Sequence, residues 1–113
     1  MRFQQRINKQ IANIKAYLIR NDTQITESTE LQLQILSTLL SDYYNASDYI
    51  EKNGYIQEFN KGTTTALNPL IKLKYESIKL IRKILKDILP KDNGDLDAEM
   101  FLQSLTNNNF NNI

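Results

Sequence analysis

Apolar residues at helical spacing between Pro69 and Leu89 constrain this chain more than any other feature. One helix face carries a first set of them: Leu70, Leu73, Ile81, Ile84, Leu85 and Ile88. A second set widens that face: Ile71, Ile78 and Leu80. The apolar arc covers about half the circumference, which is broad for a helix packed on one neighbour. We therefore expect a helix over 69–89 with two contacts, one within the chain and one with a second copy.

Three other segments have helical periodicity. Over 3–20 the apolar stripe consists of Phe3, Ile7, Ile11, Ile14 and Leu18. Over 30–52 it consists of Leu36, Leu39, Leu40, Tyr43 and Ile50, with Ala46 and Ser47 as small residues and Tyr44 and Tyr49 at its flanks. Ser28 or Thr29 is expected to cap this second helix. A short helix over 96–105 carries Met100, Phe101 and Leu105, and the asparagine-rich tail after it is expected to be disordered.

The stretch 53–69 separates the two longest helices. Asn53-Gly54 is a helix stop, because glycine adopts positive φ without a Cβ clash. Two short segments rich in β-branched and aromatic residues, 55–59 and 63–67, flank Asn60-Lys61-Gly62, which indicates a hairpin-like turn. Asn68 and Pro69 then suit the cap and first position of the next helix. A two-stranded ribbon is marginal alone, so it must pack on its own helices or on a neighbouring subunit.

These elements predict an all-α, mainly helical fold. Its centre is an antiparallel helix pair, with an N-terminal helix and a small β-hairpin-like insert. We divide the chain into a basic N-terminal helix and linker (1–28), an oligomerisation core (29–90) and a short C-terminal helix with a flexible tail (91–113).

Charge is distributed in blocks, although the net charge is only +1. Residues 1–20 carry five basic and no acidic side chains, and residues 21–60 carry seven acidic and one basic. Residues 61–91 carry eight basic and two acidic side chains, and residues 92–113 carry four acidic ones. Alternating blocks suit head-to-tail contacts between subunits and a basic face for an anionic partner. Ordinary solvated helix faces would account for the same pattern.

Two rows of cations are candidate phosphate contacts. The N-terminal row consists of Arg2, Arg6, Lys9, Lys15 and Arg20, and the second row of Lys72, Lys79, Lys83 and Lys86. Such rows gain affinity for DNA by displacing condensed counterions, without reading sequence. The competing interpretation is that both rows only keep the protein soluble.

No pattern in the sequence indicates an enzyme. The chain lacks cysteine and histidine, which removes thiol chemistry and the commonest general base and metal ligand. Glycines 54, 62 and 94 are too far apart for a phosphate-binding loop. The acids Asp92, Asp95, Asp97 and Glu99 do not have calcium-loop spacing. We therefore expect no catalytic residue, metal or cofactor. The chain also has no secretion signal and no apolar segment of about 18 residues, so we expect neither export nor membrane insertion.

Residues 36–89 resemble the small-subunit terminase family of tailed bacteriophages. The resemblance rests on a tyrosine-bearing helix, the stop at Lys52-Asn53-Gly54, a second glycine at Gly62 and the Asn68-Pro69 start of a long helix. It covers about half the chain. Of the family's proline-containing turn after the long helix, Ile88-Leu89-Pro90-Lys91 keeps only the proline, and acids and asparagines replace its arginine-bearing tail. These departures put any contact made by the tail in doubt.

The resemblance implies a non-enzymatic DNA-packaging protein. Such subunits form homo-oligomeric rings, bind double-stranded viral DNA and present it to the large terminase subunit, an ATPase and nuclease, in the host cell cytoplasm. We expect the ring contacts to involve Tyr43, Ile50, Tyr55, Phe59, Ile71, Ile78, Ile81 and Leu85. The alternative is a helical protein–protein interaction or regulatory module that does not bind nucleic acid.

Overall fold

The structure is a computed structural model that describes residues 3–54, 56–59, 64–67, 69–91 and 96–107. Within these ranges the fold is mainly helical, and the four predicted helices are confirmed. The elements in chain order are α1 (Gln4–Arg20), α2 (Glu27–Asn53), β1 (Ile56–Phe59), β2 (Thr64–Leu67), α3 (Leu70–Ile88) and α4 (Leu96–Leu105). The tail from residue 108 and the turn at 92–95 lie outside the described residues.

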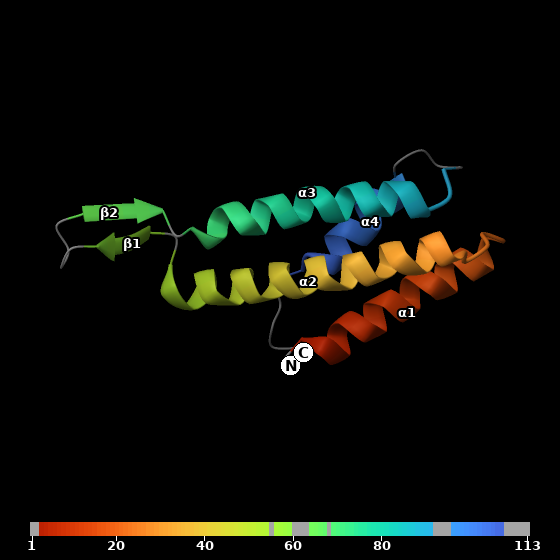
Figure 1. Ribbon diagram of the computed structural model, residues 1–113, viewed down its shortest axis with the longest axis horizontal. Helices are drawn as coiled ribbons and strands as arrows, with labels where there is room; N and C mark the ends of the chain where they lie inside the picture. The colour runs from red at the N-terminus through yellow and green to blue at the C-terminus, as the bar shows by residue number, and fades with distance from the viewer. Residues whose placement is uncertain (1–2, 55, 60–63, 68, 92–95, 108–113) are drawn as a thin grey trace.

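Helices α2 and α3 form an antiparallel pair, with the two strands projecting from one end (Figure 1). Helix α2 ends at Asn53, and Gly54 follows with a φ of 82°, which L side chains rarely adopt. Strands β1 and β2 are antiparallel, with Ile56 opposite Leu67. The predicted turn at 60–62 and the predicted cap Asn68 lie outside the described residues. The molecule is elongated, with extents of 58 × 26 × 22 Å.

Helix α2 begins earlier than expected. The side chain of Thr26, and not that of Ser28 or Thr29, accepts a hydrogen bond from the backbone N–H of Thr29 at 3.2 Å. The Thr29 hydroxyl in turn lies 3.3 Å from the Thr26 backbone nitrogen, which completes a reciprocal capping box. The predicted cap at Ser28 or Thr29 is therefore wrong, because these are the second and third residues of the helix.

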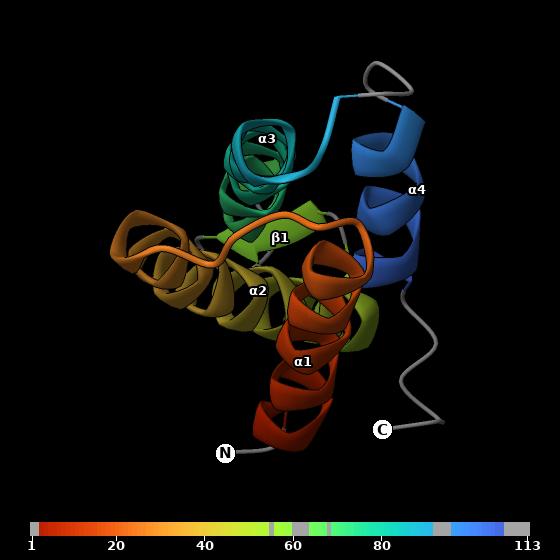
Figure 2. The same ribbon diagram turned by 90° about the vertical axis from the view of Figure 1, so that its right-hand side faces the viewer.

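The core lies between these four helices. Helix α1 lies along α2, and α4 lies beside α3 (Figure 2). The predicted α1 stripe is confirmed, since Ile7, Ile14 and Leu18 are fully buried. Tyr44 was expected at the flank of the α2 stripe, but it is buried completely because α1 covers that side of α2. Met100, one of the apolar residues noted for the short C-terminal helix, is 61% exposed, and the buried side chains of α4 are those of Ala98, Leu102 and Leu105.

The broad apolar arc of α3 has two neighbours within the chain, α2 and α4. Ile81, Leu85 and Ile88 are buried between these elements. The breadth of the arc therefore does not by itself require a second copy, contrary to the expectation from its periodicity. Leu73 and Leu80 remain 39% and 48% exposed on one edge of the arc. The helix ends where predicted, because Leu89 is forced into an extended conformation ahead of Pro90.

Candidate nucleic-acid interface

The densest group of cations lies on the C-terminal half of α3. Lys79, Lys83 and Lys86 recur every three to four residues, so they share a helix face. That face is opposite the buried side chains Ile81 and Leu85. Together with Arg82 and Lys91 the three lysines form what we call the α3 patch. Its five cations and the carboxylate of Asp87 line a shallow surface hollow.

Members of the α3 patch differ in their partners. Lys79 and Lys83 are exposed, and within the described part of the chain neither forms an ion pair. Arg82 is engaged, because its Nε donates a hydrogen bond of 2.9 Å to Oε1 of Glu99 on α4. Lys72 belongs to the predicted second row of cations and lies nearest the start of α3. Its Nζ is 3.9 Å from Oε1 of Glu76. The cations that are available to an external anion are thus concentrated around Lys79 and Lys83.

The predicted N-terminal row does not form one continuous face. Lys9 and Arg20 are exposed, with the Arg20 guanidinium 6.0 Å from the Tyr17 ring centroid. Arg6 turns into the fold, where its Cζ lies 4.5 Å from the centroid of the Tyr44 ring. Its Nη2 donates a hydrogen bond of 2.6 Å to the carbonyl of Asn107. Arg2 lies outside the described residues. Lys9 and Arg20 are therefore the described members of this row that face solvent without a carboxylate partner.

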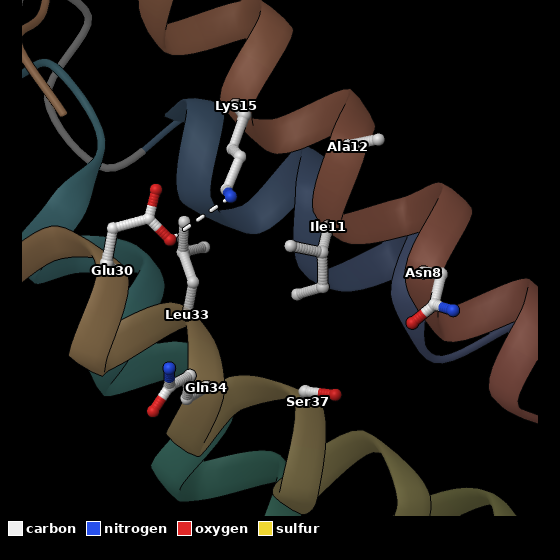
Figure 3. A pocket seen from close by; sticks show the side chains of 8 residues that line it. All are labelled: Asn8, Ile11, Ala12, Lys15, Glu30, Leu33, Gln34 and Ser37. Atoms are coloured by element: carbon white, nitrogen blue, oxygen red, sulfur yellow. Dashed lines mark ion pairs between the residues drawn. The ribbon is translucent and has the colours of Figure 1, made fainter.

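Lys15 faces the groove between α1 and α2 instead. Its Nζ lies 3.1 Å from Oε2 of Glu30, and Figure 3 shows this pair at one end of the groove. Farther along, Ile11 and Leu33 point toward each other, and Asn8 and Ser37 lie at the other end. Among the described residues that line the groove, the only charged side chains are those of Lys15 and Glu30, which neutralise each other. This groove therefore offers no net charge to an anion. Its residues belong to the packing of α1 against α2.

A polar cluster that the sequence did not predict lies where α1, α2 and the end of α4 meet. The hydroxyls of Tyr43 and Tyr44 donate to the carbonyls of Thr106 and Leu105, next to the Arg6–Asn107 contact. Burial raises the pKa of the Tyr44 hydroxyl, and the Arg6 charge and the Gln10 amide 2.8 Å away only partly oppose this. Adjacent tyrosines on an apolar stripe were the available signal, because a buried tyrosine hydroxyl requires a partner.

The predicted oligomer contacts are mostly taken up within one chain. Tyr43, Ile50, Ile81 and Leu85 are buried in this chain, and Ile71 and Ile78 are half-buried. Tyr55 and the side chain of Phe59 lie outside the described residues. The exposed apolar side chains on the helix pair are other ones: Leu31, Ile35, Tyr49, Leu73, Tyr75 and Leu80.

Other site types have little support in the described residues. No group of three or more acidic side chains there is arranged to hold a metal ion. None of the helices in the described ranges has the length and apolar character needed to cross a bilayer. Comparisons of the chain with protein-family models, with curated proteins and with solved structures found no match.

Proposed function

We propose that this chain is the small subunit of a phage terminase. In this role it binds double-stranded viral DNA in the host cell cytoplasm and brings it to the large terminase subunit during genome packaging. The observation that carries the proposal is the α3 patch, in which Lys79 and Lys83 face solvent without a carboxylate partner among the described residues. The resemblance of residues 36–89 to that family supports it from the sequence.

Binding by the α3 patch rests on phosphate contacts. A lysine is a compact charge on a flexible stem, so it follows a phosphate backbone without reading base edges. Each phosphate that is neutralised releases condensed counterions, which makes the affinity fall steeply with salt. The exposed cations Lys9 and Arg20 on α1 add to the same electrostatic attraction.

Self-association into a ring would strengthen this weak contact. Copies of the α3 patch arranged around a ring bind one duplex with an avidity greater than that of any single patch. Support comes from exposed Leu73 and Leu80, whose seven-residue spacing places them on one side of α3. The paired strands β1 and β2 project beyond the helix pair (Figure 1), and we propose that they contact a neighbouring subunit in the ring.

DNA binding is tested by fluorescence anisotropy with a labelled duplex at several salt concentrations. Lys79→Gln/Lys83→Gln should weaken binding about tenfold and reduce the salt slope by about two, since two phosphate contacts are lost. The matched control is Lys15→Gln/Lys52→Gln, which removes the same charge from lysines already paired with Glu30 and Asp48. Equal losses from the two double variants would contradict a specific role for the α3 patch.

Self-association is tested by the mass in solution from light scattering. The wild-type chain should have several times the monomer mass, and Leu73→Gln/Leu80→Gln should lower it. Tyr75→Gln is the control, because Tyr75 is also exposed but its position in the sequence puts it on the other flank of α3. A monomeric wild-type chain at high concentration would refute the ring.

The second candidate is a helical interaction module that does not bind nucleic acid. It is favoured by the exposed apolar residues Leu96 and Met100 on α4 and by a shallow hollow beside Tyr17 and Phe101. An absence of salt-dependent DNA binding by the wild-type chain would favour this module over the packaging protein.

A further inference from the structure

Arg82 is a cation of the α3 patch that another helix already engages. Its partner Glu99 belongs to α4. The positive charge that the α3 patch presents to solvent therefore depends on whether α4 is docked. The side chains of Arg82 and Glu99 are 41% and 42% exposed, respectively. Because both are open to solvent, an external anion can reach the guanidinium and exchange with the carboxylate.

We infer that Glu99 competes with nucleic-acid phosphate for Arg82, so that the docked helix α4 limits the number of cations in the DNA-binding surface. The inference rests on the proposed DNA-binding function and assigns a regulatory role to α4 within it. With Glu99 in place, the Arg82 guanidinium is paired with a carboxylate of the same chain. When Glu99 is neutralised or displaced, Arg82 becomes an additional phosphate contact beside Lys79 and Lys83.

Contacts that do not involve Glu99 hold α4 in place. In its first turn, Asp97 accepts a hydrogen bond of 2.6 Å from the Tyr17 hydroxyl. At its other end, side chains of α1 and α2 bind the carbonyls of Leu105, Thr106 and Asn107. The side chains of Leu102 and Leu105, on α4 itself, are buried in the core. Neutralising Glu99 therefore leaves α4 docked, which separates the effect of its charge from any effect on the fold.

Competition of this kind is reciprocal. If docking of α4 lowers the affinity for DNA, then DNA lowers the affinity of α4 for its docking site by the same factor. We therefore expect backbone amides of Leu96–Leu105 to exchange faster in the DNA complex than in the free protein, while those in the centre of α2 do not.

The decisive comparison is between Glu99→Gln and Asp97→Asn, measured by duplex anisotropy. Each variant removes one negative charge, without a change in size, from the first turn of α4. Glu99→Gln should bind DNA about three to ten times more tightly at low salt, with a salt slope steeper by about one. Asp97→Asn keeps a side-chain oxygen that can accept the Tyr17 hydrogen bond, so α4 stays docked and the affinity should change less than about twofold. Equal gains from both variants would overturn the inference, because they would reflect net charge alone.

A double-mutant cycle with Arg82→Gln provides an independent check. In the wild-type background Arg82→Gln should weaken binding less than about twofold, because Glu99 already occupies the guanidinium. In the Glu99→Gln background it should abolish the whole gain. The same fold-loss in both backgrounds would overturn the competition. If the wild-type chain shows no salt-dependent DNA binding, the proposed function itself fails, whereas intact wild-type binding with an additive cycle rejects only the role of Glu99.

Discussion

The hydroxyl of Tyr44, on α2, donates a hydrogen bond to the carbonyl of Leu105, the last residue of α4. The hydroxyl of the neighbouring Tyr43 donates a hydrogen bond of 3.1 Å to the carbonyl of Thr106, and the Arg6 guanidinium donates one to the carbonyl of Asn107. The last carbonyls of a helix lack donors within the helix. Three side chains of α1 and α2 thus cap α4 and place the C-terminal helix against the rest of the fold.

Removing the Tyr44 hydroxyl should destabilise the protein. Tyr44→Phe leaves the buried carbonyl of Leu105 without this donor, which costs about 1–3 kcal/mol in the free energy of unfolding. Urea unfolding followed by circular dichroism measures the loss. Tyr75→Phe is the control, because Tyr75 is exposed on α3 and should change stability by less than about 0.5 kcal/mol. Similar losses in both variants would show that the hydroxyl does not cap α4.

Stability should decrease at alkaline pH because of the same residue. Burial raises the pKa of Tyr44, so the folded chain keeps this proton where the unfolded chain loses it. The contribution is complete below about pH 10 and is lost as the pH rises through the folded pKa. Unfolding midpoints measured across this range should fall more steeply for the wild-type chain than for Tyr44→Phe. Parallel pH profiles would contradict the assignment.

The start of α2 can be tested by exchanging its cap. Thr26→Ala removes the side-chain acceptor of the Thr29 N–H and should cost about 1 kcal/mol. Ser28→Ala, two residues later, should change stability by less than about 0.5 kcal/mol, because Ser28 is an exposed residue inside the helix. Thermal unfolding of the two variants distinguishes the residues, and a larger loss at Ser28 would restore the cap expected from the sequence.

Truncation of the α2 stripe should reveal which leucines form the core. Leu40→Ala should cost about 2–5 kcal/mol, because Leu40 is fully buried and its loss leaves a cavity. Leu31→Ala should cost less than about 0.5 kcal/mol for the monomer, because Leu31 is exposed on the same helix. Denaturant unfolding at low protein concentration measures both, and equal costs would place Leu31 inside the core.

The sequence by itself determined the four helices, the ends of α2 and α3 and most of the apolar faces, but not the start of α2. Periodicity over a few turns marks 3–20 and 69–89 as helices, and Gly54 and Pro90 stop α2 and α3 through local backbone sterics. The solvent-facing row around Lys79 and Lys83 follows from the same spacing. Each of these features depends on residues within one segment of a few helical turns, so it can be recognised without knowing the rest of the fold.

Only the tertiary structure decided which neighbour covers each face. Periodicity shows that the α3 arc is broad, but not that α4 covers one side of it where a second copy was expected. Likewise, it is α1 that buries Tyr44, and Arg6 turns inward to Asn107, 101 residues away. The Arg82–Glu99 contact depends on the docking of α4 in the same way. The physical reason is that burial and hydrogen bonding depend on distances between helices, and helical spacing within one segment carries no information about them.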